Sequence, residues 1–170
     1  MKEFKHILVP LDGSLLAERA LPLALTLADA FESQIMLMRV IDIPMLVTPV
    51  IYPEFPATQV TEVHEMARQE AEEYLYSKRD ELMRAGYNVK AFVGEASPAE
   101  HIMGIAAEQT VDLIVMSTHG RRGLTRWALG SVADKIVRHG PCPVLLIRQK
   151  MEFDEESLEE ITLAMPEAVA

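Results

Sequence analysis

Five short apolar segments alternate with helix-forming segments along the chain, and this alternation leaves few folds open. The apolar segments are nearly continuous, which is typical of strands buried on both faces of a parallel sheet. Parallel strands need a crossover connection, and a helix usually supplies it. We therefore expect an α/β fold, a single open five-stranded parallel sheet with helices on both faces. The expected strands cover residues 6–11, 34–41, 88–93, 111–116 and 143–147.

Four helices are expected between these strands, and proline, glycine and serine mark their limits. Pro22 is expected to kink the first helix because it removes an amide donor. Gly86 ends the second helix, Ser97 caps the third and Ser131 caps the fourth. The segment 42–59 contains four prolines and predicts an irregular functional or interface loop. The expected helices cover residues 14–31, 60–85, 97–109 and 131–139.

The length of 170 residues suits one domain, and the charge distribution separates an acidic tail from it. Residues 151–170 hold seven Asp and Glu and no Lys or Arg, whereas the remainder carries 16 Lys and Arg against 19 Asp and Glu. We expect one domain over residues 1–150 and a solvated acidic tail over 151–170. The net charge of −10 argues against non-specific nucleic-acid binding, because phosphate backbones demand clustered cations.

Cysteine content and apolar runs indicate the cellular compartment. The single cysteine, Cys142, excludes an intramolecular disulfide, and the amino-terminal residues lack the pattern of a signal peptide. The longest markedly apolar uncharged run, 43–53, is shorter than the roughly 20 residues that a membrane-spanning helix needs. We expect a cytoplasmic protein with no membrane span.

Two glycine-containing loops follow the first and fourth expected strands, at the place where open parallel sheets bind ligands. Such ligands bind outside the carboxyl ends of strands, where the strand order reverses. With strand order 3-2-1-4-5, residues 10–14 and 117–123 edge one crevice, which continues through 129–131. The glycines let the backbone approach a ligand closely, and a helix opening at Ser131 presents free amides that favour an anion. The pattern indicates phosphate binding.

The spacing in the second loop resembles the nucleotide motif of universal stress proteins, specifically the branch that binds ATP. That motif is glycine, two residues, glycine, nine residues, then glycine followed by serine or threonine. Here Ser117-Thr118-His119-Gly120, residues 121–129 and Gly130-Ser131 match it, with Ser117 in place of the first glycine. The likeness spans about residues 3–149 and includes the runs Pro-Leu-Asp-Gly-Ser and Gly-Pro-Cys-Pro-Val-Leu-Leu-Ile. It implies the adenine nucleotide alpha hydrolase-like fold, with strand order 3-2-1-4-5.

The resemblance implies ATP or AMP as the ligand, with Mg or Mn on its phosphates and no metal ligand assigned among the side chains. Asp12 and Val40 match positions that contact adenine. Gly120 and Gly130 match positions whose amides bind phosphates, and Ser131 offers its hydroxyl. The implied nucleotide-binding residues are Pro10, Asp12, Gly13, Ser14, Val40, Met116, Ser117, Thr118, His119, Gly120, Arg121, Arg122, Gly123, Gly130, Ser131 and Val132.

The same resemblance implies a role as a nucleotide-dependent switch or scaffold in a stress response. Members of the family commonly dimerise by pairing their last strands, so residues 144–147 are the expected homodimer interface. The apolar character and short length of this segment suit an edge strand that is buried in a dimer.

Other interpretations of the same residues stay open. Asp12 also suits an Asx turn, and Ser131 also suits a plain helix cap. His119 has no carboxylate or second histidine placed beside it by the sequence, so no catalytic residue is predicted. An enzyme that hydrolyses ATP slowly is one alternative. A non-nucleotide interaction module of the same family is another, supported by Ser117.

Overall fold

The computed structural model describes residues 3–42, 57–118 and 129–148. Five parallel strands form one sheet in the order β3-β2-β1-β4-β5, so the predicted α/β fold and strand order are confirmed. The strands are β1 (His6–Pro10), β2 (Gln34–Ile41), β3 (Val89–Glu95), β4 (Leu113–Ser117) and β5 (Val144–Ile147). The helices are α1 (Leu15–Glu18), α2 (Leu21–Phe31), α3 (Ala57–Arg84), α4 (Pro98–Glu108) and α5 (Ser131–His139).

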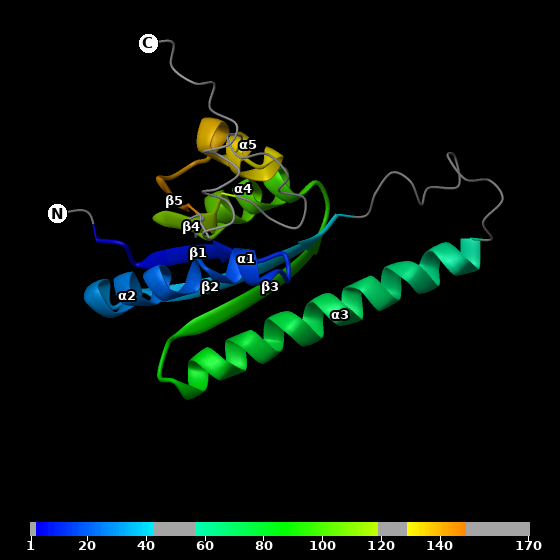
Figure 1. The fold of residues 1–170 in the computed structure, drawn as a ribbon, viewed down its shortest axis with the longest axis horizontal. Helices are drawn as coiled ribbons and strands as arrows, with labels where there is room; N and C mark the ends of the chain where they lie inside the picture. The colour runs from blue at the N-terminus through cyan, green and yellow to red at the C-terminus, as the bar shows by residue number, and fades with distance from the viewer. Residues whose placement is uncertain (1–2, 43–56, 119–128, 149–170) are drawn as a thin grey trace, which may run out of the picture.

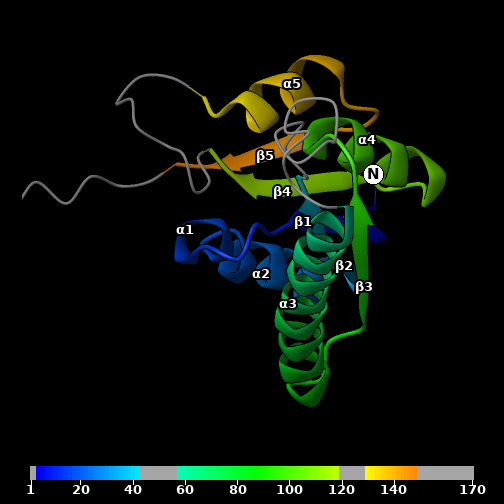
Figure 2. The ribbon, with the colours of Figure 1, turned by 90° about the vertical axis from the view of Figure 1, so that its right-hand side faces the viewer.

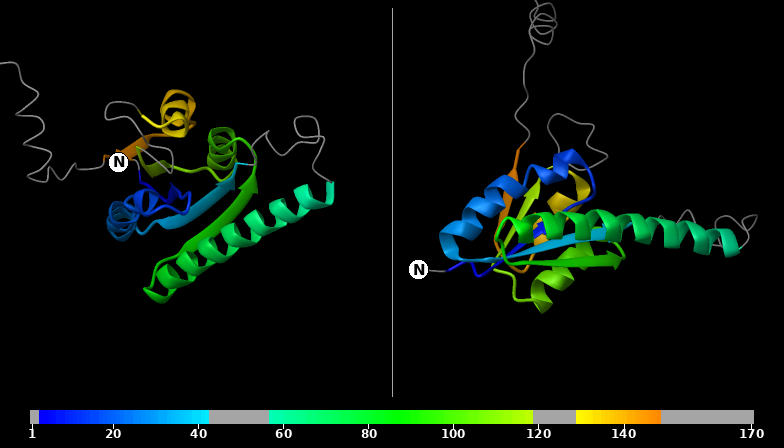
Figure 3. Two further views of the ribbon diagram at one scale, coloured as in Figure 1. Left: turned by 45° about the vertical axis from the view of Figure 1, so that its right-hand side comes forward. Right: turned by 90° about the horizontal axis from the view of Figure 1, so that it is seen from below.

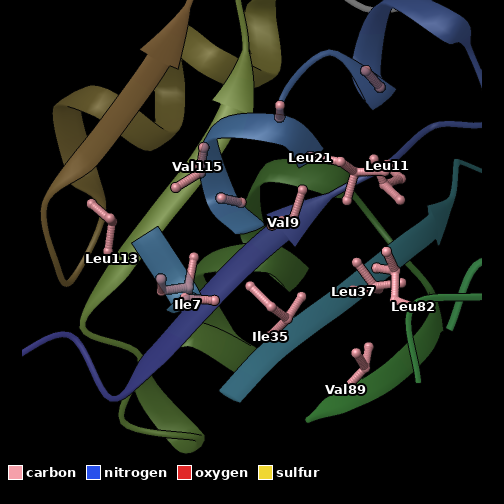
Figure 4. Packing of buried hydrophobic residues seen from close by; sticks show 14 of the residues in the cluster. Ile7, Val9, Leu11, Leu21, Ile35, Leu37, Leu82, Val89, Leu113 and Val115 are labelled. Carbon is pink, nitrogen blue, oxygen red and sulfur yellow. The ribbon is translucent and has the colours of Figure 1, made fainter. Parts of the chain in front are cut away.

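Helices cover both faces of the sheet, as the continuous apolar strands predicted. Figure 1 shows α4 and α5 on one side of the sheet and α1, α2 and α3 on the other, and Figure 2 shows the same layers from the side. Successive residues of a strand point to opposite faces. In β1, Ile7 and Val9 therefore join the core under α1–α3, while Leu8 joins the core under α4 and α5. Figure 4 shows the first of these cores.

The first predicted helix is two helices, α1 and α2, so the expectation of one kinked helix was wrong. Pro22 lies in the first turn of α2. A proline there costs no hydrogen bond, because the first amides of a helix have no intrahelical partner. The proline therefore begins a new helix at Leu21 instead of kinking a continuous one.

Helix α3 is longer than predicted at its start and ends one residue before the predicted end. It begins at Ala57, so residues 57–59 belong to a helix and the predicted loop is shorter by that much. Residues 43–56 of that loop lie outside the described residues, as does the tail. Gly86 follows the last turn with φ +96°, a conformation that glycine adopts without strain. Figure 3 shows that the first turns of α3 extend past the carboxyl end of β3.

The parallel arrangement places the carboxyl ends of β1, β2 and β4 at the same edge of the sheet. The chain continues from these ends into the segments that the sequence singled out. Within the described ranges, none of the helices combines the length and the apolar character that crossing a membrane requires.

Candidate functional site

A cavity of about 510 Å³ opens at the carboxyl ends of β1, β2 and β4, with α3 on one side and the first turns of α4 and α5 on the other. Nine of the predicted nucleotide-binding residues line it: Pro10, Asp12, Val40, Met116, Ser117, Thr118, Gly130, Ser131 and Val132. Gly13 and Ser14 are not among the lining residues. His119, Gly120, Arg121, Arg122 and Gly123 lie outside the described residues.

The turn after β1 holds Asp12 at the wall of the cavity. One carboxylate oxygen of Asp12 accepts hydrogen bonds from the backbone N–H of Ser14 at 2.9 Å and from the Ser14 hydroxyl at 2.6 Å. Gly13, between them, has φ +84°, which suits glycine. The Ser14 hydroxyl oxygen then caps α1 by accepting from the N–H of Ala17 at 3.1 Å. Asp12 thus makes an Asx turn and also lines the cavity.

The chain leaves the end of β4 and returns to the same place at the start of α5. Ser117 and Thr118 are buried, with 7% and 6% of their surface exposed. The N–H of Thr118 donates to the carbonyl of Ile147 at 3.1 Å, and the N–H of Gly130 donates to the carbonyl of Thr118 at 2.9 Å. These bonds fix both ends of the predicted phosphate loop against the sheet.

Helix α5 begins one residue differently from the prediction of a serine cap. Gly130 is the N-cap residue and Ser131 is already the first helical residue, so the predicted cap role of Ser131 was wrong. No side-chain cap bond is made at this helix start. Ser131, Val132 and Ala133, the residues of the first turn, line the cavity. The free amides and the positive end of the helix dipole therefore lie at the cavity wall, where they favour an anion.

Helix α3 and the end of β2 contribute lining residues that the sequence analysis missed. Arg39 is buried at 7% exposure, and its guanidinium lies 3.0 Å from the Glu70 carboxylate and 5.2 Å from the centre of the Tyr74 ring. A charged residue inside an otherwise apolar strand was the available signal for Arg39. Leu11 also lines the cavity and belongs to the segment 10–14 that was expected at its edge, although it was not among the implied binding residues. The other missed lining residues are Ala17, Met38, Ile41, Asp42, Ala67, Glu70, Pro98, Ile102 and Ala133.

Charged and polar groups behind Arg39 join α1 to α3. The Tyr74 hydroxyl donates to Glu18 at 2.8 Å, and the Lys78 ammonium lies 3.0 Å from the other oxygen of that carboxylate. Burial raises the pKa of Tyr74 far above its ordinary value, so the phenol stays protonated and remains a donor. The hydrogen bond to Glu18 raises the pKa of Lys78. This network holds the helices that wall the cavity on the Arg39 side.

The described residues contain no group of three or more His, Cys, Asp or Glu that would hold a metal ion.

The family model for the "Universal stress protein family" matches residues 3–148. This chain belongs to the universal stress protein family. It is 34% identical over 169 residues to the protein SH1215 of Staphylococcus haemolyticus, covering 98% of this chain and 96% of that protein. Because so little of the chain is left out, that alignment reaches into the acidic segment 151–170.

Two solved structures share the fold of this chain. The protein MJ0577 of Methanocaldococcus jannaschii has a TM-score of 0.77 at 29% identity, covering 89% of this chain and 100% of that chain. A universal stress protein family protein from Arabidopsis thaliana, solved with AMP bound, has a TM-score of 0.56 at 18% identity. The match covers 91% of this chain and 98% of the Arabidopsis chain, and at this identity it shows the shared fold.

Proposed function

We propose that this universal stress protein binds ATP or AMP in the cavity and acts as a nucleotide-dependent switch or scaffold in a stress response. The observation that carries the proposal is the first turn of α5, which lies at the cavity wall with no side-chain cap. Backbone amides in this position favour phosphate oxygens. A cavity of about 510 Å³ is within the usual range for small-molecule sites.

The sequence motif and the cavity support the same placement of the phosphates. Ser117, Gly130 and Ser131 belong to the motif and line the cavity. Ser117, which stands where the motif has its first glycine, is buried at the end of β4, and the cavity remains open beside it. The phosphates would lie against α5, and the nucleoside would lie toward the ends of β1 and β2. The Arabidopsis structure, of the same fold, holds AMP.

The cation, the assembly and the compartment belong to the same proposal. Mg or Mn would bind with the phosphates, which provide the oxygen ligands that such cations prefer. A homodimer would pair through β5, which is an edge strand with half-buried residues. The domain would comprise residues 1–150 in the cytoplasm, with 151–170 as an acidic appendage.

Native mass spectrometry of the freshly purified protein tests the ligand and the assembly together. We expect the mass of two chains, each carrying an adenine nucleotide identifiable after release. Calorimetric titration of the stripped protein with ATP and AMP, with and without Mg, then gives the affinities. We expect micromolar dissociation constants, since three or four bonds to a charged group supply on the order of 8 kcal/mol. Absence of heat at high concentrations of both nucleotides would contradict the proposal and favour a non-nucleotide interaction module.

A further inference from the structure

Arg39 is a buried cation at a position where an apolar residue would satisfy the packing. It continues the row of Ile35 and Leu37 on the face of β2 that α3 covers, and those two residues are fully buried in the apolar core. A charged side chain in such a row loses its hydration, a cost that an apolar residue of similar size avoids. Two partners offset part of this cost: Glu70 forms an ion pair with the guanidinium, and the Tyr74 ring lies 5.2 Å from it.

The position of Arg39 separates it from the proposed phosphate end of the cavity. Strand β1 lies between β2 and β4, so the ends of β2 and β4 are about 10 Å apart across the sheet. Helix α5, whose first turn would receive the phosphates, packs on the face opposite to α3. Arg39 therefore lines the part of the cavity where the nucleoside would lie.

The ion pair with Glu70 also makes Arg39 a poor phosphate-binding cation. The carboxylate at 3.0 Å largely neutralises the guanidinium, so the pair adds little net charge to attract an anion. The guanidinium nevertheless has five N–H donors in a rigid plane, and one carboxylate does not occupy all of them. What the pair can offer a ligand is an oriented hydrogen-bond donor.

We propose that Arg39, held in place by Glu70, donates a hydrogen bond to an acceptor atom of the nucleoside part of the bound nucleotide. This inference rests on the proposed nucleotide binding and adds a contact for the base or the ribose. Glu70 is the positioning residue, because its carboxylate accepts a hydrogen bond from one guanidinium nitrogen at 3.0 Å and ties that end of the side chain to α3. Arg39 would then take part both in the ligand contact and in the attachment of α3 to the cavity wall.

Titration of adenosine, AMP and ATP into the wild-type protein and into Arg39→Met tests the contact. We expect the variant to lose affinity by the same factor for all three ligands, about ten- to a hundredfold, because the lost bond is common to them. Arg68→Met is the matched control. Arg68 lies on α3 next to Ala67, pairs with Glu72 and is not among the residues that line the cavity. The control should bind all three ligands as the wild type does.

The variant is chosen so that folding does not obscure the result. Methionine keeps an unbranched stem, and the Glu70 side chain is 68% exposed, so water hydrates its carboxylate when the partner is removed. Thermal unfolding without ligand checks this for each variant. Arg39→Lys is the second variant. Lysine keeps the positive charge but lacks the planar guanidinium group. We expect a smaller loss of affinity than in Arg39→Met, again equal for the three ligands.

Two results would overturn the inference while nucleotide binding stands: adenosine affinity unchanged in Arg39→Met, or a loss that grows from adenosine to AMP to ATP. The second pattern would make Arg39 a phosphate contact. Failure of the wild-type protein to bind any of the three ligands would instead overturn the proposed function, and the inference with it.

Discussion

The two ends of the cavity are built from different parts of the chain. At the β1 and β2 end, side chains form the wall: Asp12 in its turn and Arg39 with Glu70 across to α3. At the β4 and α5 end, Met116 is the one long side chain among the described lining residues of these two elements, and the rest of the wall includes Gly130, the short side chains of Ser117 and Ser131, and the amides of a helix start without a side-chain cap. A wall of side chains is sensitive to which residue is present, whereas a wall of backbone is sensitive to any added bulk.

The largest effect should come from adding bulk at the backbone-built end. Gly130 lines the cavity with φ −57° and ψ 147°, which valine adopts without strain, so Gly130→Val adds bulk next to the first-turn amides without straining the backbone. We expect ATP affinity to fall about a hundredfold through the loss of bonds to a charged group, and adenosine affinity to change less than about threefold. Isothermal titration measures both.

Gly104→Val is the matched control for that experiment. Gly104 lies within α4, and a Cβ built on it meets nothing within 4 Å. The same substitution at this open position should leave the affinity for ATP unchanged. An equal loss of ATP and adenosine binding in Gly130→Val would contradict the division of the cavity into two ends.

A smaller effect is expected from the Asp12 turn at the side-chain-built end. Asp12→Ala removes two hydrogen bonds to Ser14, and we expect the free energy of unfolding to fall by about 1–3 kcal/mol. We also expect adenosine, AMP and ATP to bind about tenfold more weakly, since the turn shapes that wall. Asp12→Asn keeps an oxygen acceptor for both bonds and should restore most of the stability in urea unfolding. If Asp12→Ala weakens ATP but not adenosine, Asp12 serves the phosphate end.

The smallest effect is expected from the ion pair that joins α4 to α5 on the surface. Lys135 lies 2.7 Å from the Glu100 carboxylate, and its hydrogen bond lowers the pKa of Glu100. Such a lowered pKa stabilises the fold above the unfolded pKa of the carboxyl, and this stability is lost as the pH falls through the folded value. We expect Lys135→Met to raise the pKa of Glu100 in an NMR titration and to leave ATP affinity unchanged. A marked loss of ATP binding would show that the pair orients α5.

The alternation of apolar and helix-forming segments was enough to predict the sheet and its covering layers. Local signals failed where one residue suited two roles, or where a neighbouring residue took the predicted role. Pro22 carried the signal for a kink and for a helix start, and the start prevailed because a first-turn proline loses no hydrogen bond. Ser131 carried the signal for a cap, but Gly130 takes that position and leaves Ser131 inside the helix.

The sequence predicted the parts of the candidate site that short continuous segments form, and it missed the parts that distant segments bring together. Asp12 and Ser131 were found because each follows a strand or opens a helix within a recognisable turn. Glu70 and Ala67 were missed because they reach the cavity only through the packing of α3 against the sheet, which no short segment encodes. Arg39 carried a signal, a charge within an apolar strand, whose meaning depends on the partner that the fold brings to it.

The length of α3 gives its attachment at Glu70 a mechanical consequence. At 1.5 Å per residue the 28-residue helix is about 42 Å long, and about 20 Å of it precedes Glu70. The first half of the helix therefore extends away from its attachment point at Glu70, which lies at the cavity. A tilt of about 10° at Glu70 would displace the first residues of α3 by about 3.5 Å, so the direction of this helix depends on the contacts made near the cavity.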